Sequence, residues 1–195
     1  MNSFKPLFTS IILLLLTNSC LDGFKTSPEK LSPAKDFQEV NIQDKYIISV
    51  PNYMKSTTIL NDEASMQYMN ALKETYMVVI DEDKAQMIEA LKMVDEYKED
   101  QSVLDNYARF QTTSIMEGLN VGSQSEIKSV TVDGKSARVF EADGRLDGVP
   151  YDIQYILGFT EGEEDVYMIM TWTLKSRAER YSGTLRQIIK SFKEI

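Results

Sequence analysis

Apolar and polar residues alternate most regularly in the C-terminal third of the chain. Every second residue is apolar from Tyr151 to Phe159 and again from Val166 to Leu174, which is the pattern of strands that bury one face. Asp133-Gly134 is a two-residue hairpin signal, and Asp143-Gly144 with Asp147-Gly148 brackets a second reversal. We therefore predict an antiparallel meander with one buried face in this part of the chain.

Shorter apolar patterns predict the other elements of the folded body. Residues 37–42, 46–50 and 76–81 are expected to be strands, and residues 84–97 and 102–119 carry apolar side chains at helical spacing. Before the last helix, a serine followed three residues later by a glutamate predicts a capping box, and an apolar stripe suited to packing on a sheet follows it. The capping pair is Ser176 and Glu179, and the stripe is Tyr181, Leu185, Ile188, Ile189 and Phe192.

The segment 61–74 has two interpretations. Its composition and the spacing of Met66, Met69 and Leu72 favour a helix, whereas Met66, Tyr68 and Asn70 would share one face of a strand. Periodicity alone leaves both interpretations open.

The first nineteen residues have the order of a secretory signal. A short segment with Lys5 precedes the apolar stretch Leu7–Leu16, and small polar residues follow it. The uncharged run from Pro6 to Leu21 is shorter than the roughly 20 residues that a membrane-spanning helix needs. We therefore predict that residues 1–19 are a signal peptide rather than a core element or a membrane span.

Cys20, the only cysteine, follows the small residue Ser19 and resembles the modified cysteine in the lipobox of bacterial lipoproteins. The family pattern has leucine three residues before the cysteine, where this chain has Thr17, and Leu16 lies one position further back. The resemblance implies transfer of a diacylglyceryl group to the thiol, cleavage before Cys20 and acylation of the new amino group with fatty acids such as palmitate. The alternative is ordinary cleavage near Ser19, which would leave a free thiol.

Residues 20–36 are expected to be the lipidated cysteine and a flexible linker, because two Ser-Pro pairs and scattered charges show no period. Residues 37–195 then form one α+β domain, which is long enough to bury a core without disulfides or metal. A multi-acyl anchor would tether this domain to a membrane of the bacterial cell envelope, on its periplasmic or surface face.

The composition excludes several functions. The formal net charge of −9 disfavours binding to nucleic acid and to anionic lipid, so the predicted membrane attachment depends on Cys20. Without histidine the chain has no Ser-His or Cys-His pair and no histidine-ligated metal. We find no phosphate-binding loop and no nucleophile motif, and we expect no cofactor and no enzymatic activity.

Three stretches resemble the PsbP-like superfamily, which includes the photosystem II subunit PsbP, Ran-binding nucleotide-release factors and many bacterial lipoproteins. They are "YIISVP" near the start of the body, the segment from "VDGKSARVF" to "MIMTWTL", and the closing "LRQIIKSFKEI". The resemblance covers residues 37–195 and implies a central antiparallel sheet flanked by helices, an α/β/α sandwich, with a strand within 61–74. Members of this fold mostly act as docking or assembly modules on unrelated partners, so the resemblance does not itself carry a function.

The acidic turn 161–165 is the one cluster with candidate ligand chemistry. Glu161, Glu163, Glu164 and Asp165 could form a weak oxygen-ligand site for calcium, or they could be a solvated hairpin tip whose charges prevent edge aggregation.

Asp81, Glu82 and Asp83 begin like a calcium loop but lack its later ligands and turn glycine, so a charged helix N-terminus is the better interpretation. Met168, Met170 and Trp172 are interpreted as core because of their alternation.

We therefore expect a membrane-tethered envelope lipoprotein that acts as a non-catalytic docking or assembly module for a protein partner. The alternative is a carboxylate-dependent hydrolase or a calcium-dependent binding protein, for which acids would have to converge in a pocket.

Overall fold

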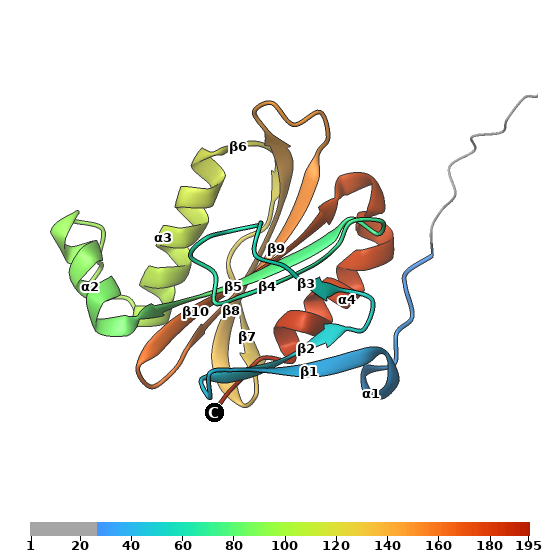
Figure 1. The fold of residues 1–195 in the computed structure, drawn as a ribbon. Coiled ribbons are helices and arrows are strands. Elements are labelled where there is room, and N and C mark those ends of the chain that lie inside the picture. The colour runs from blue at the N-terminus through green and yellow to red at the C-terminus, as the bar shows by residue number, and fades with distance from the viewer. Residues whose placement is uncertain (1–26) are drawn as a thin grey trace, which may run out of the picture.

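The computed structural model describes residues 27–195, which form a large antiparallel sheet covered on both faces (Figure 1). The strand order in this sheet is β3-β4-β5-β10-β9-β8-β6, and β7 also pairs with β8. Its strands are β3 (Lys55–Ser56), β4 (Met66–Asn70), β5 (Thr75–Asp83), β6 (Leu119–Gln124), β7 (Lys128–Val132), β8 (Lys135–Leu146), β9 (Ile153–Glu161) and β10 (Asp165–Leu174).

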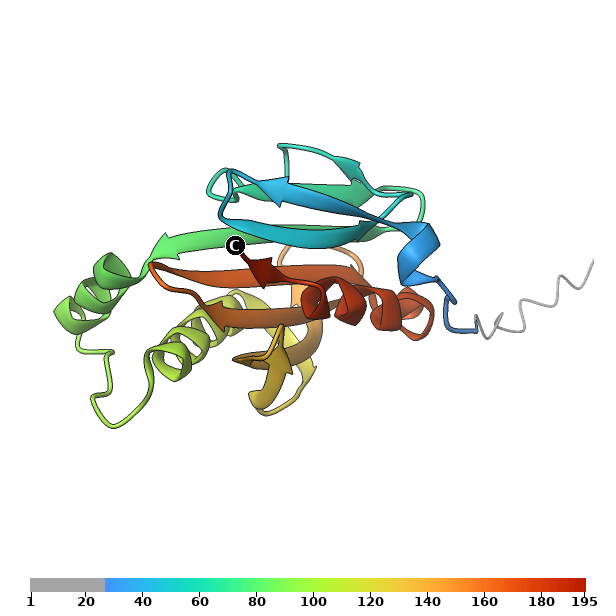
Figure 2. The ribbon, with the colours of Figure 1, turned by 90° about the horizontal axis from the view of Figure 1, so that it is seen from below.

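One face of the large sheet is covered by helix α4 and by a small second sheet. The small sheet has the order β1-β2-β11 and lies beside α4 over the large sheet (Figure 2). Ile48 of the small sheet, Ile169 of the large sheet and Leu185 of α4 are all fully buried in this layer. The elements are β1 (Phe37–Ile42), β2 (Tyr46–Pro51), β11 (Lys193–Glu194), the 3-10 turn η1 (Lys175–Arg177) and α4 (Ala178–Lys190).

Helices α2 (Lys84–Met93) and α3 (Val103–Glu117) cover the opposite face. Leu91 of α2 and Tyr107 of α3 are buried there with Phe159 of β9, whose ring meets that of Tyr107 edge to face at 5.9 Å. The predicted α+β class and the flanked antiparallel sheet are thus confirmed. Among residues 27–195 we find no helix with the length and apolar character needed to cross a membrane.

Several predicted elements form at or near the expected limits, although the helix predicted over residues 84–97 ends at Met93. Residues 37–42 and 46–51 are strands β1 and β2, Asp133-Gly134 turns the β7–β8 hairpin, and the segment 61–74 contains strand β4 rather than a helix. Asp83 caps α2 by accepting a hydrogen bond from the backbone of Gln86 at 2.8 Å, as a charged helix N-terminus would.

The predicted antiparallel meander is confirmed in β7 to β10, but the prediction that only one of its faces is buried is wrong. Tyr167 and Ile169 point to the α4 face of β10, while Val166 and Met168 point to the α2–α3 face, and all four are buried. An alternating sequence shows which side chains share a face of a strand, but it does not show whether the more polar face is exposed. Here both faces are covered, so polar residues such as Thr171 are buried as well.

Other local predictions are corrected as well. Asp143-Gly144 lies inside β8 and pairs with β9, so the reversal uses only residues 147–152. Ser176 lies in η1, and Arg177 precedes α4 without a side-chain cap, so the predicted capping box does not form. Tyr151 lies before β9 and is 60% exposed.

Candidate functional site

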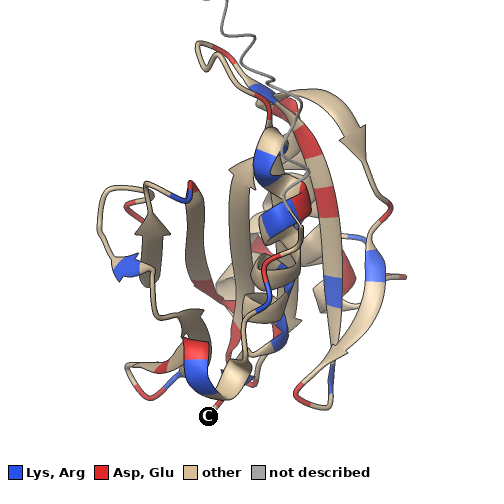
Figure 3. Cartoon of the chain, turned by 90° about the vertical axis from the view of Figure 1, so that its right-hand side faces the viewer, with Lys and Arg blue, Asp and Glu red and all other residues tan. Residues whose placement is uncertain are grey.

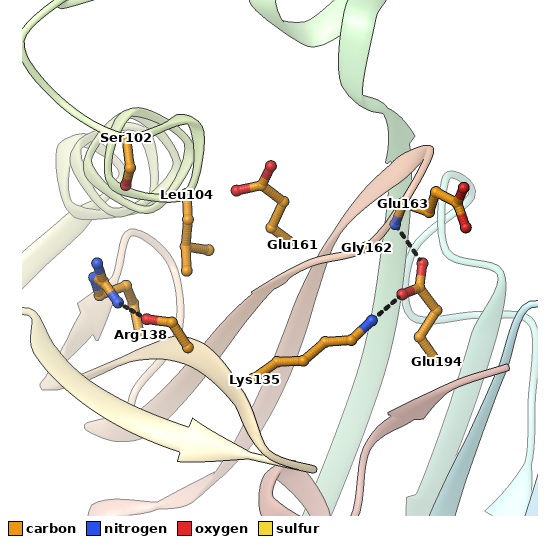
Figure 4. A pocket seen from close by; sticks show the side chains of 9 residues that line it. Ser102, Leu104, Lys135, Arg138, Glu161, Gly162, Glu163 and Glu194 are labelled. Carbon is orange, nitrogen blue, oxygen red and sulfur yellow. Dashed lines mark hydrogen bonds and ion pairs between the residues drawn. The ribbon is translucent and has the colours of Figure 1, made fainter.

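The predicted acidic turn joins β9 to β10 and contributes residues to two open hollows at one end of the large sheet, the first of which is shown in Figure 4. The first hollow, of about 540 Å³, lies between this turn, the start of α3 and strand β8. The second, of about 410 Å³, lies on the side of the small sheet. Lys135, Glu163 and Glu194 line both hollows.

The acids of the turn are divided between different lysines. Glu161 pairs with Lys84 at 3.2 Å, and Asp165 pairs with Lys45 at 3.0 Å. Lys45 also pairs with Asp81 at 2.8 Å, and hydrogen bonds to Asp81 and Asp165 raise the pKa of Lys45 above its ordinary range. Burial is the largest influence on the Asp81 carboxyl and raises its pKa, but hydrogen bonds from Lys45 and Ser65 together with the charge of Lys45 outweigh burial and leave that pKa lowered.

The remaining charges of the hollows are paired in the same way. Glu194 pairs with Lys135 at 2.5 Å and accepts a hydrogen bond from the backbone N–H of Glu163 at 2.8 Å. Arg138 pairs with Asp105 of α3 at 2.6 Å, and this guanidinium lowers the pKa of the Asp105 carboxyl. The side chains of Glu163 and Glu164 are exposed.

These pairings decide what the acidic turn can do. A calcium site needs several oxygen ligands directed at one point, and a hydrolase needs two carboxylates facing one cleft. Here Glu161 and Asp165 are directed at separate lysines. Within residues 27–195, no group of three or more His, Cys, Asp or Glu side chains is arranged to hold a metal ion. Two of the four carboxylates of the turn, those of Glu161 and Asp165, are thus partners of lysine in this structure.

A second candidate site is a row of aromatic side chains that crosses the large sheet. Trp172 of β10 is paired with Tyr76 of β5 on one side and with Tyr155 of β9 on the other. The rings of Tyr76 and Trp172 stack at 5.4 Å with an interplanar angle of 12°, and those of Tyr155 and Trp172 lie 6.3 Å apart. Met69 of β4 extends the row beyond Tyr76. We call Met69, Tyr76, Trp172 and Tyr155 the aromatic row.

The outer part of the aromatic row is only half-buried because of where the helices pack. Helix α3 packs on β6, β8 and β9, and α2 packs near Ile80, further along β5. Tyr155 is therefore buried, whereas Met69, Tyr76 and Trp172 keep part of their surface in solvent. Interpreting Trp172 as core was correct only in part, because the sequence pattern does not show which end of a strand the helices cover.

An ion pair lies beside the aromatic row. Glu74 pairs with Arg177 at 3.0 Å next to Tyr76. Burial, assisted by Glu74, raises the pKa of Tyr76. Apolar rings with polar groups at their edge are a composition typical of protein-binding surfaces.

The predicted modification site Cys20 lies outside the described residues. Residues 27–36 belong to the predicted linker, and the structure shows that part of this segment contacts the domain: the Glu29 carboxylate accepts hydrogen bonds from Tyr53 and Thr184. Linker composition gave no signal for this contact.

Comparison with known proteins finds similarity in structure and none in sequence. No family model and no curated protein matches the chain. The solution structure of cyanobacterial PsbP (CyanoP) from Synechocystis sp. PCC 6803 is similar with a TM-score of 0.53 and 11% identity, over 82% of this chain and 93% of that one. The resemblance to the PsbP-like fold is thus confirmed.

Two other solved structures are similar at lower TM-scores, each with 11% identity. PA94 from Pseudomonas aeruginosa, a protein of unknown function, has a TM-score of 0.44 over 80% of this chain and 94% of that one. LpqN from Mycobacterium tuberculosis, described as involved in cell envelope biogenesis, has a TM-score of 0.43 over 83% of this chain and 92% of that one.

Proposed function

We propose that this PsbP-like domain is a membrane-tethered envelope module that binds a protein partner through the aromatic row, without catalysing a reaction. The observation that carries the proposal is the half-buried stack of Trp172 on Tyr76 at the part of the sheet beside α3. Trp172 is the only tryptophan of the chain.

The chemistry of the aromatic row suits protein binding. Tryptophan and tyrosine dominate the binding energy of protein interfaces because large rigid rings bury much area at low entropic cost. The backbone under the rings is held by pairing on both sides of β10, so the surface is already ordered before a partner arrives. Arg177, already paired with Glu74, would form part of the polar rim.

The tether in this proposal is the lipid at Cys20. Mass spectrometry of the native N-terminus tests it, with Cys20→Ala as the control that cannot be lipidated. We expect a diacylated or triacylated Cys20 as the first residue in the wild-type protein. A mature protein that begins near residue 20 and carries an unmodified Cys20 thiol would refute the anchor.

Affinity capture from detergent-solubilised envelopes tests the docking surface. Trp172→Ala and Met69→Glu should each reduce recovery of the partner at least about tenfold, because loss of an interface hot spot costs 2 kcal/mol or more. Met93→Ala is the matched control, since Met93 is 87% exposed on α2, away from the row. Thermal unfolding of each variant shows whether the fold is intact. Equal recovery with all folded variants would refute the docking surface.

A further inference from the structure

A small polar site on the domain binds the side chain of Glu29, a residue of the predicted linker. The Glu29 carboxylate is only 8% exposed and accepts hydrogen bonds from Tyr53 Oη at 3.0 Å and Thr184 Oγ1 at 2.9 Å. Lys73 Nζ lies 2.8 Å from the same carboxylate and 4.3 Å from the centre of the Tyr53 ring. The backbone N–H of Glu29 donates to the carbonyl of Arg180 at 2.8 Å.

The segment after Glu29 is also held against the domain. Helix α1 (Pro33–Asp36) follows, and Asn52 donates from its backbone to the Asp36 carbonyl at 2.8 Å and from its side chain to the Lys35 carbonyl at 3.0 Å. We call residues 29–36 the strap. With the strap bound, the chain leaves the domain at Glu29 rather than at Phe37.

The strap changes the reach of the tether. From Cys20 to Asp36 an extended chain would span at most about 55 Å, whereas the part from Cys20 to Glu29 spans at most about 30 Å. A domain of this length has a radius of gyration of about 15 Å and is therefore roughly 40 Å across. The longer tether would let any side face the membrane, but the shorter one keeps the end near Glu29 closest to the anchor.

That end carries an exposed apolar tip. Leu72, in the β4–β5 turn next to Lys73, is 90% exposed, and its carbonyl accepts a hydrogen bond from Arg177 Nη1 at 3.0 Å. Lys73 and Arg177 at this end are paired with Glu29 and Glu74, and Arg180 and Glu179 at the start of α4 add one charge of each sign. Figure 3 looks onto this end and shows basic and acidic residues interspersed over it.

We propose that the Glu29 strap orients the tethered domain so that Leu72 contacts the lipid surface, with Arg180 at the level of the headgroups. This inference rests on the proposed lipidation of Cys20, because the domain itself has no other anchor in the proposal. Exposed leucine enters the acyl boundary favourably, and an arginine is attracted to anionic headgroups. The far end of the molecule, at α2, then points away from the membrane (Figure 1).

An environment-sensitive fluorophore tests this orientation on the full-length lipidated protein. Leu72→Cys and Met93→Cys are each labelled with a nitrobenzoxadiazole maleimide, and the protein is reconstituted into vesicles of phosphatidylethanolamine and phosphatidylglycerol. The two positions are a matched pair, because Leu72 is 90% and Met93 87% exposed. We expect a blue shift and an increase in emission at position 72 and no shift at position 93.

The strap is tested by Glu29→Lys, which places two ammonium groups together at Lys73. With the label at position 72, this variant should lose the blue shift, while the labelled protein stays bound to the vesicles. Equal shifts at positions 72 and 93, no shift at 72, or an unchanged shift in Glu29→Lys would each overturn the inference.

Failure of the anchor is distinguishable from failure of the orientation. Mass spectrometry of each labelled sample reports whether Cys20 carries lipid. A sample without lipid that does not sediment with vesicles refutes the anchor and, with it, the inference. A lipidated sample that sediments but gives no difference between positions 72 and 93 refutes the orientation alone.

Discussion

The Glu29 carboxylate lies 2.8 Å from the Lys73 ammonium, which joins a residue of the predicted linker to the β4–β5 turn of the large sheet. Because Glu29 is 8% exposed and also accepts bonds from Tyr53 and Thr184, removing its charge weakens three interactions at once. We predict that Glu29→Gln lowers the free energy of unfolding by about 1–2 kcal/mol, measured by urea denaturation. The control Glu39→Gln, on the exposed side of β1, should change it by less than about 0.5 kcal/mol.

Helix α4 approaches β9 most closely at Gly158. A Cβ on Gly158 would lie far inside van der Waals contact with the Ile189 side chain, whereas a Cβ on Gly183 of α4 meets nothing within 4 Å. We therefore predict that Gly158→Ala destabilises the protein by about 1–3 kcal/mol through overpacking. Gly183→Ala should stabilise it by up to about 1 kcal/mol, because alanine is the better helix former. Thermal unfolding of both variants checks the prediction, and equal melting temperatures would contradict the packing described for α4.

Acid should remove stability that the ion pairs of α3 and β8 supply. Arg138 lowers the pKa of Asp105 below its ordinary value of 3.8. A carboxyl whose pKa is lower in the folded state than in the unfolded state stabilises the fold. This contribution is complete at a pH above the unfolded-state pKa, and it disappears as the pH falls through the folded-state pKa. Wild type should therefore be more stable than Asp105→Asn at pH 7, and the difference should shrink below about pH 4. Urea denaturation across this range measures it, and a constant difference would contradict the pairing.

The hairpin and the last helix could be predicted because their signals are local. Asp133 and Gly134 both take positive φ in the β7–β8 turn, as a two-residue turn requires, and the apolar stripe of α4 lies within one helix. The capping box predicted at Ser176 does not form, because such a box needs an α-helix that starts at the next residue, and here the 3-10 turn η1 comes first.

The candidate sites could not be predicted in the same way because their partners are distant in the chain. Lys45 and Lys84 neutralise Asp165 and Glu161 only after β2, β5 and β10 have come together. The alternation of Trp172 predicts a strand, but its half-exposure depends on where α3 packs on the sheet. Glu29 has no local pattern at all, since Tyr53, Lys73 and Thr184 come from three separate elements.

The acidic turn gives a prediction about calcium. Because Glu161 and Asp165 are each paired with a lysine, a calcium ion would have to displace an ammonium group from each of them. We expect millimolar calcium to leave the melting temperature unchanged relative to the same concentration of magnesium. A selective rise with calcium, abolished in Glu161→Gln, would restore the calcium-binding alternative.

The most direct test of the docking proposal is photo-crosslinking in the living cell from position 76. A photoreactive phenylalanine analogue replaces Tyr76 in the aromatic row or, as the control, Val94, which is 61% exposed after α2. The account predicts a covalent adduct with one protein from position 76 and none from position 94. Adducts of the same size from both positions, or no adduct from position 76 in a folded and anchored protein, would contradict it.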